Sequence, residues 1–229
     1  MGLRLVPMIE RWDLTGFQAW PVTAETGWGW APLSGVLGFA EVGTVMAVLA
    51  RADAEPGADS EGAPECDALS PAEADAATLV RRLLAQEDLI ATGGLELRDQ
   101  AARVSISPGC CSGLEEWRSW ESLFAGETPW FGHDPSPWAE FDGERLRVWQ
   151  DGGLGETRWG RCVEVPVQAL AGLLRAAQDD LRAFLGLVGE WGEVVVPGLA
   201  ARLVGRLDAA FDITGPLDVP EPGGERSRS

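Results

Sequence analysis

Hydrophobic and polar positions alternate with two different periods along the chain, and the helical period is clearest near the C-terminus. From Val167 to Val188, and again towards Phe211, apolar residues recur at steps of three and four, with charged residues between them. A helix places residues at these steps on one face. The sequence therefore predicts two amphipathic helices, one beginning at Pro166 and one beginning at about Val196.

A period of two, typical of half-buried strands, marks several shorter segments. The strand-like runs are residues 3–6, 95–97, 103–107, 138–141, 144–149 and 158–165. The dipeptide Asp142-Gly143 separates two of them and is a strong signal for a hairpin. Residues 27–32 are predicted to be a turn-rich break. Residues 35–49 fit either a pair of strands or one irregular helix.

Two further helices are predicted from capping patterns. Ser70, followed by Pro71 and by Glu73 three residues later, indicates a helix start, and the helix should run to about residue 87. Ser112 with Glu115 repeats the capping-box spacing and predicts a helix to about residue 124.

These elements predict an α+β fold, because strand runs are followed by helix runs. We expect an antiparallel sheet with hairpins, built from residues 95–165 and part of 1–50 and covered by the two C-terminal helices. The expected organisation has four parts: a strand- and turn-rich segment (1–50) packing on the main domain, an acidic flexible loop (51–70), the main domain (71–214) and a disordered tail (215–229).

The chain is strongly acidic, with 36 acidic and 18 basic residues among 229 and a formal charge of −18. Such a surface repels phosphates, so direct nucleic-acid or anionic-membrane binding is not expected. It favours encounter with a basic protein partner. Lys, Asn and Tyr are absent, which indicates a GC-rich genome. No secretory signal or membrane span is recognisable, so a cytoplasmic location is expected.

Cys110 and Cys111 precede the helix predicted from Ser112, where backbone amides lower a thiol pKa. With His133 and Asp134 they have the ingredients of nucleophilic catalysis. The simpler interpretation, that the thiols pack as small apolar groups and the histidine orders a turn, is favoured. A zinc site would combine Cys110 or Cys111 with Cys162 and His133, and with Asp134 as a further candidate. Adjacent cysteines rarely both reach one ion in good geometry, so no metal site is expected. The chain shows none of the common nucleotide, hydrolase or metalloprotease motifs, and no cofactor is expected.

Tryptophan is the other unusual feature, with 11 residues in the chain. Most are expected in the core, but tryptophan is also favoured in binding hot spots. The partner-binding candidates share the segment 117–149 and are Trp117, Trp120, Trp130, His133, Asp134, Trp138 and Trp149.

The blocks Gly109-Cys110-Cys111, Leu114–Trp117, Pro129–Trp138 and Val148–Gly152 resemble a family of uncharacterised actinobacterial proteins over about residues 90–190. That family implies no activity. In its acidity, its tryptophans and its expected mixture of helices and hairpins, the chain is also similar in general style to bacterial immunity proteins of polymorphic toxin systems.

Three functions therefore stand as hypotheses. The first is a non-catalytic protein-binding module, of immunity type, that neutralises a basic toxin or enzyme. The second is a small enzyme using Cys110 or Cys111 with His133. The third is a regulator that binds a small ligand or a metal ion. The sequence favours the first and leaves the oligomeric state open.

Overall fold

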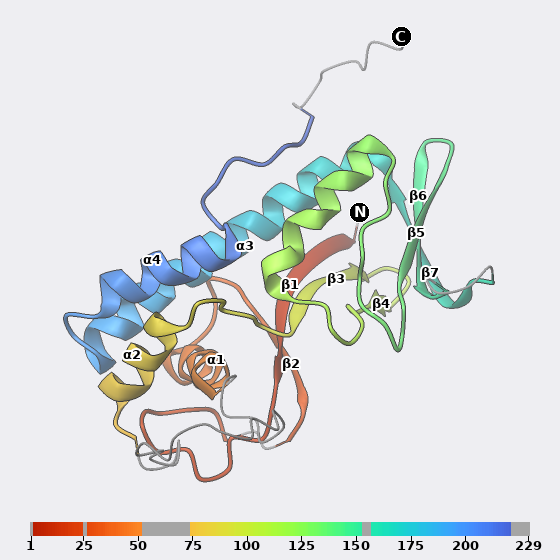
Figure 1. The fold of residues 1–229 in the computed structure, drawn as a ribbon. Coiled ribbons are helices and arrows are strands. Elements are labelled where there is room, and N and C mark those ends of the chain that lie inside the picture. Colours follow the sequence, from red (N-terminus) through yellow and green to blue (C-terminus); the bar gives the residue numbers. More distant parts are fainter. Residues whose placement is uncertain (1, 25–26, 52–73, 153–156, 221–229) are drawn as a thin grey trace.

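The computed structural model describes residues 2–24, 27–51, 74–152 and 157–220 and shows an α+β fold (Figure 1). Two antiparallel sheets form the β part, one of four strands in the order β2-β1-β3-β4 and one of three in the order β5-β6-β7. Their strands are β1 (Leu3–Arg11), β2 (Gly29–Pro32), β3 (Gly93–Asp99), β4 (Val104–Ile106), β5 (Trp138–Asp142), β6 (Arg145–Asp151) and β7 (Trp159–Pro166).

Helices cover the larger sheet, as the sequence predicts. They are α1 (Phe39–Arg51), α2 (Ala76–Ala85), the 3₁₀ helix η2 (Leu114–Ala125), α3 (Val167–Val195) and α4 (Ala200–Phe211). The long helix α3 packs against β1, and α4 packs on α3 and contacts η2. No helix in the described ranges is long and apolar enough to cross a membrane.

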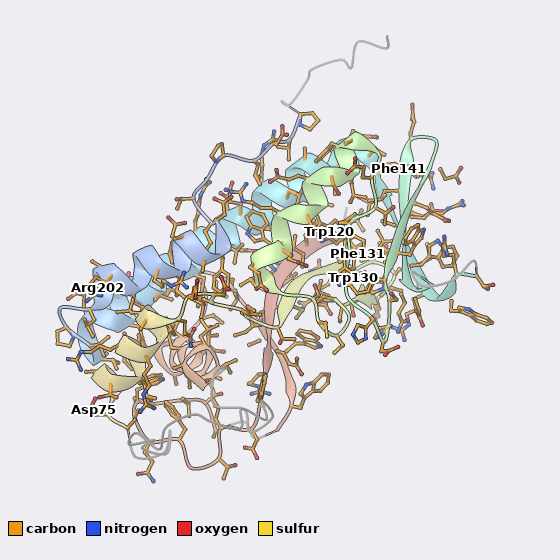
Figure 2. The ribbon with its side chains drawn as sticks, in the orientation of Figure 1. Asp75, Trp120, Trp130, Phe131, Phe141 and Arg202 are labelled. Atoms are coloured by element: carbon orange, nitrogen blue, oxygen red, sulfur yellow. The ribbon has the colours of Figure 1, made fainter. Side chains whose placement is uncertain are left out.

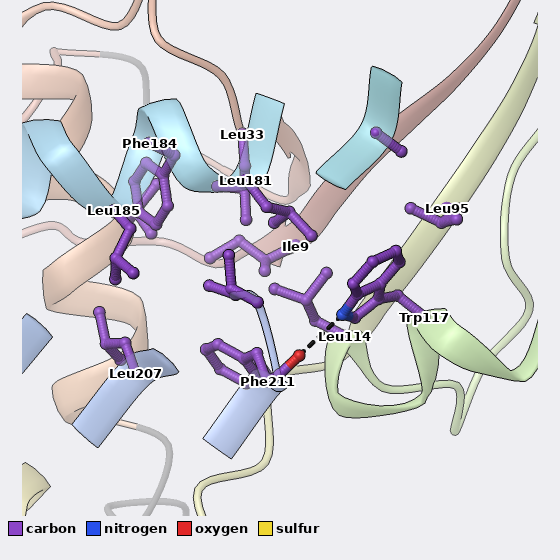
Figure 3. Close-up of a cluster of buried hydrophobic side chains, with 14 of the residues drawn as sticks. Ile9, Leu33, Leu95, Leu114, Trp117, Leu181, Phe184, Leu185, Leu207 and Phe211 are labelled. Carbon is purple, nitrogen blue, oxygen red and sulfur yellow. Dashed lines mark hydrogen bonds between the residues drawn. The ribbon is translucent and has the colours of Figure 1, made fainter. Parts of the chain in front are cut away.

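The N-terminal segment belongs to the same sheet as the main domain. Residues Leu3–Ile9 of β1 pair with Gly93–Asp99 of β3, so the first strand lies inside the sheet and not beside it. On one face of β1, Ile9 packs with Leu181 and Phe184 of α3 (Figure 3). Neighbouring residues of a strand point to opposite faces, so Glu10 faces away from this helix layer.

Three N-terminal predictions need correction or completion. The ambiguous stretch 35–49 becomes helical from Phe39, where α1 begins, and the supposed break at 27–32 contains the edge strand β2. Helix α2 begins at Ala76, because the Asp75 carboxylate caps it by accepting a hydrogen bond of 2.7 Å from the Thr78 amide (Figure 2 labels Asp75). Ser70, the predicted cap, and most of the acidic loop 51–70 lie outside the described residues.

The predicted helix after Ser112 exists, but it is a 3₁₀ helix and Ser112 does not cap it. Gly113 occupies the N-cap position without a side-chain hydrogen bond, and Glu115 accepts from the Ala91 amide instead, at 3.2 Å. A 3₁₀ helix has three residues per turn, so residues three apart share one face. The buried residues have this spacing and are Leu114, Trp117, Trp120 and Leu123.

The hairpin and the C-terminal helices are confirmed with shifted boundaries. Asp142 pairs with Arg145, so the two turn residues are Gly143 and Glu144. Helix α4 begins at Ala200, four residues beyond the predicted start. Gly198 precedes it with φ +85°, a left-handed conformation that interrupts the helical path.

The segment 215–220, the first part of the tail predicted to be disordered, makes hydrogen bonds to the domain. Gln178, a buried side chain of α3, donates a hydrogen bond of 2.7 Å to the Gly215 carbonyl. The Arg118 guanidinium donates to the Pro216 carbonyl at 2.9 Å. These bonds satisfy backbone groups that would otherwise bind water. Residues 221–229 lie outside the described chain.

Candidate functional site

Two loops that are far apart in sequence meet beside the four-stranded sheet. We call residues 108–113 and 130–136 the paired loops. The Cys110 amide donates to the His133 carbonyl at 2.7 Å, and the His133 amide donates to the Cys110 carbonyl at 3.0 Å. A third bond, from the Gly109 amide to the Phe131 carbonyl at 2.7 Å, extends the pairing. Backbone bonds thus place Cys110 opposite His133.

Two glycines make this close approach possible. A Cβ atom at Gly109 would lie 2.1 Å from the Pro135 carbonyl oxygen. A Cβ atom at Gly132, which has φ +96°, would lie 2.5 Å from the Gly109 carbonyl. Distances this short are steric overlaps, so neither position accepts a side chain without separating the loops. The glycines therefore set the spacing of the site.

Further hydrogen bonds anchor the paired loops to both sheets. The buried Ser136 hydroxyl donates to the Gly132 carbonyl at 3.1 Å, and its amide donates to the Asp151 carboxylate of β6 at 3.1 Å. On the other loop, the Ser112 carbonyl accepts from the Gly93 amide of β3 at 2.9 Å. The site is consequently supported by regular structure on both sides.

The paired loops bring the predicted catalytic residues together. The Sγ atoms of Cys110 and Cys111 are 3.5 Å apart. These two atoms and a ring nitrogen of His133 all lie within 4.8 Å of one another. The His133 Nδ1 atom donates to the Asp134 carboxylate at 3.2 Å. Both cysteines are exposed, which makes the predicted burial of these thiols wrong.

The electrostatics of the thiols differ from the prediction. A hydrogen bond with the Cys111 thiol, then partial desolvation, raises the pKa of Cys110 above its ordinary value. The helix dipole does not reverse this, because η2 begins only at Leu114, beyond Cys111. For Cys110 the predicted lowering of the pKa is therefore wrong, and its thiol carries less thiolate at neutral pH than a free cysteine.

Cys162 does not join this group. It lies half-buried on β7, where burial raises the pKa of its thiol, and within the described residues it is not part of the cysteine–histidine cluster. A zinc site that includes Cys162 is thus not supported. The fourth cysteine, Cys66, lies outside the described residues.

A cleft of 660 Å³ opens beside the paired loops, and Cys110 lies on its wall. It is more than twice the volume of the hollows of 280 Å³ and 300 Å³ beside β1, near Val48 and Thr44. Its lining comes from β1, β2 and β4 and residues next to the strands of that sheet, from the paired loops, and from β6 and β7. The residues are Glu10, Trp28, Trp30, Thr92, Ser105, Ser107, Pro108, Gly109, Cys110, Asp134, Pro135, Gln150 and Arg161.

The rim of this cleft is aromatic and carries carboxylates. Trp28 is 69% exposed and packs edge-on against Trp30, with ring centroids 6.1 Å apart. The Trp28 indole N–H donates to the Glu10 carboxylate, which faces the cleft from β1. Asp134 contributes a second carboxylate and Arg161 a cation.

The tryptophans predicted to bind a partner divide into two groups. Trp117 and Trp120 are 1% and 4% exposed, so they are core residues and not docking residues. The Trp117 indole donates to the Phe211 carbonyl at 2.7 Å (Figure 3), and Trp120 packs on Phe131 of the paired loops. Trp130 (labelled in Figure 2), in contrast, is 48% exposed, and its ring lies beside that of His133.

Trp138 and Trp149 lie opposite each other on β5 and β6 and are half-buried. The Trp149 indole donates to the Glu140 carboxylate at 3.1 Å, and the Arg158 guanidinium lies 4.7 Å from the Trp138 ring centroid. The indole N–H of Trp149 and the ring face of Trp138 are thus already engaged by neighbouring side chains.

The residues that shape the cleft rim, Glu10, Trp28 and Trp30, were not among the predicted site residues. The available signal was the two-residue spacing of the tryptophans in Gly27-Trp28-Gly29-Trp30, which places both indoles on one face of an extended segment. Because residues 27–32 were predicted to be a turn-rich break, this strand-like spacing was not recognised.

The fold and the site together define an α+β protein with a tryptophan-lined cleft next to an exposed cysteine–histidine cluster. Comparisons with protein-family models, with curated proteins and with solved structures give no match to this chain.

Proposed function

We propose that this chain is a cytoplasmic, non-catalytic binding protein of immunity type that holds a cationic segment of a basic protein in its tryptophan-lined cleft. The observation that carries the proposal is the exposed Trp28, packed on the half-buried Trp30 and beside the Glu10 carboxylate, at the rim of a 660 Å³ cleft.

The chemistry of the rim suits a guanidinium or ammonium group. Indole faces attract cations, and the gain rises when the cation is partly desolvated. A neighbouring carboxylate adds a charge-assisted hydrogen bond, strongest for arginine. Trp28 supplies the first kind of contact, and Glu10 and Asp134 supply the second.

The charge of the whole chain acts over a longer range. A net charge of −18 attracts a basic partner and speeds its encounter, and added salt screens this attraction. The enzyme alternative is less well supported, because the raised pKa of Cys110 disfavours the nucleophilic thiolate.

The test is capture of the partner from a lysate of the native host with the tagged chain. Trp28→Ala and Glu10→Gln remove the two rim contacts. Trp159→Ala is the matched control, because Trp159 is 65% exposed on β7 but does not line the cleft. Each variant is first compared with the wild type by circular dichroism.

The proposal expects one basic protein, retained in stoichiometric amount by the wild type and by Trp159→Ala and released by high salt. Trp28→Ala and Glu10→Gln should retain much less of it. Equal retention by all four proteins would place binding elsewhere, and an empty capture would remove the support for a protein partner.

A further inference from the structure

The structure brings two thiols and an imidazole into one cluster that the proposed function does not use. We propose that Cys110, Cys111 and His133 bind one zinc ion, with Asp134 positioning the imidazole and the fourth coordination position open to solvent. The proposed ion lies at the wall of the same cleft, since Cys110 and Asp134 also line it, but zinc binding is measured without any partner.

The donor set matches the chemistry of zinc. Zinc binds cysteine sulfur and histidine nitrogen in tetrahedral geometry, and sites with three protein ligands leave a fourth position for water or another ligand. Two thiolates and one imidazole are such a set. The carboxylate of Asp134 next to His133 adds negative charge that favours a cation.

The distances are close to those that zinc requires. Two sulfurs bound at 2.3 Å with a tetrahedral angle lie about 3.8 Å apart, and a sulfur and a nitrogen about 3.6 Å apart. The observed Sγ–Sγ separation is 3.5 Å, and all the ligand atoms lie within 4.8 Å of one another. Small rotations of exposed side chains suffice to close the remaining gap.

The backbone explains how adjacent cysteines can serve one ion. Neighbouring side chains of an extended segment point to opposite sides, which normally separates adjacent thiols. Cys111 has φ +60°, a left-handed conformation that breaks this alternation, and the two sulfurs meet. The paired backbone bonds between Cys110 and His133 then fix the imidazole relative to the thiols.

Asp134 has the role of a positioning residue. A metal-bound histidine almost always donates its second ring N–H to a carboxylate, a carbonyl or water, and loss of that partner weakens metal binding by about 10–100-fold. The contact of His133 Nδ1 with the Asp134 carboxylate is of this kind. In the proposed site Nε2 is therefore the zinc ligand, and Asp134 orients the imidazole.

The experiment is a titration of the reduced, metal-free protein with Zn²⁺, in competition with a chromophoric chelator, together with a Co²⁺ titration that reports thiolate ligands by charge-transfer absorption. We expect one ion per chain. Cys110→Ser, Cys111→Ser and His133→Gln should each weaken Zn²⁺ binding at least tenfold and reduce the Co²⁺–thiolate band where a sulfur is lost. Asp134→Asn should weaken Zn²⁺ binding while keeping that band.

Cys162→Ser is the matched control, because it removes a thiol outside the cluster. Its affinity for Zn²⁺ should equal that of the wild type. The substituted cluster residues are at the surface, and circular dichroism verifies that each variant is folded. The proposal is overturned if the reduced wild type fails to compete for Zn²⁺, if the cysteine variants bind as tightly as the wild type, or if Cys162→Ser loses binding equally.

Discussion

The spacing of the paired loops depends on Gly132, and replacing it with alanine is the sharpest test of that arrangement. The new Cβ atom would lie 2.5 Å from the Gly109 carbonyl, and the residue would keep a backbone φ of +96°. Gly198→Ala is the matched control, because Gly198 has a similar φ of +85° but no atom within 4 Å of its Cβ position.

The two substitutions share one cost and differ in another. A left-handed backbone conformation costs a non-glycine residue about 1–2 kcal/mol. Gly132→Ala adds a steric overlap that must be relieved by backbone movement, which typically costs about 1–3 kcal/mol. We therefore expect losses of unfolding free energy of about 1–2 kcal/mol for Gly198→Ala and about 2–5 kcal/mol for Gly132→Ala.

Urea unfolding followed by circular dichroism measures both values on the same chain. We expect Gly132→Ala to unfold at a lower midpoint urea concentration than Gly198→Ala, with the same dependence of the unfolding free energy on urea. If the two variants lose the same free energy, the overlap at the Gly109 carbonyl is relieved at no cost, and the paired loops are not held as closely as described.

Three further predictions concern the core, a helix cap and the thiols. Trp117→Phe leaves the buried Phe211 carbonyl without its donor and should lower the free energy of unfolding in urea by about 1–3 kcal/mol. The control Trp159→Phe changes an exposed residue and should alter this free energy by less than about 0.5 kcal/mol. Equal effects of the two substitutions would contradict the buried hydrogen bond. The capping bonds lower the pKa of Asp75, so its stabilising effect is present above the unfolded pKa and is lost as pH falls through the folded value. Asp75→Ala should therefore lower the thermal midpoint at pH 7 but not in strong acid, and a pH-independent difference would refute this. The pKa values of Cys110 and Cys162 are raised, so iodoacetamide should alkylate these two thiols more slowly at neutral pH than it alkylates a free cysteine. Labelling of either thiol at pH 7 as fast as that of a free cysteine, read by peptide mass spectrometry, would disprove the direction. For the same reason, the stabilisation from the half-buried Cys162 thiol should be lost as pH rises through its folded pKa.

Local patterns predicted the fold class because each element carries its own signal. The long amphipathic repeat of α3 and the alternation in β5 and β6 depend on residues close in sequence. The nature of η2 was also readable in principle: its apolar residues from Leu114 to Leu123 recur strictly every three positions, which is the period of a 3₁₀ helix. The capping-box interpretation of Ser112 obscured this signal.

The tail and the site depend on contacts that no local rule contains. Residues 215–220 look disordered by composition, but Arg118 and Gln178, each from another helix, bind their carbonyls. Cys110 and His133 were singled out one by one from their chemistry. Their juxtaposition requires long-range backbone pairing and the two tight glycines, and neither follows from the spacing along the chain.

The central claim is that the Trp28–Trp30 rim holds a cation of the partner, and the affinity of the captured partner tests it most directly. Binding is followed by titration at low and high salt for the wild type, Trp28→Ala and Trp159→Ala. The account predicts a Kd that increases with salt and a further increase of about tenfold or more for Trp28→Ala, as for a binding hot spot, with Trp159→Ala unchanged. A Kd that responds to neither salt nor the loss of Trp28 would contradict it.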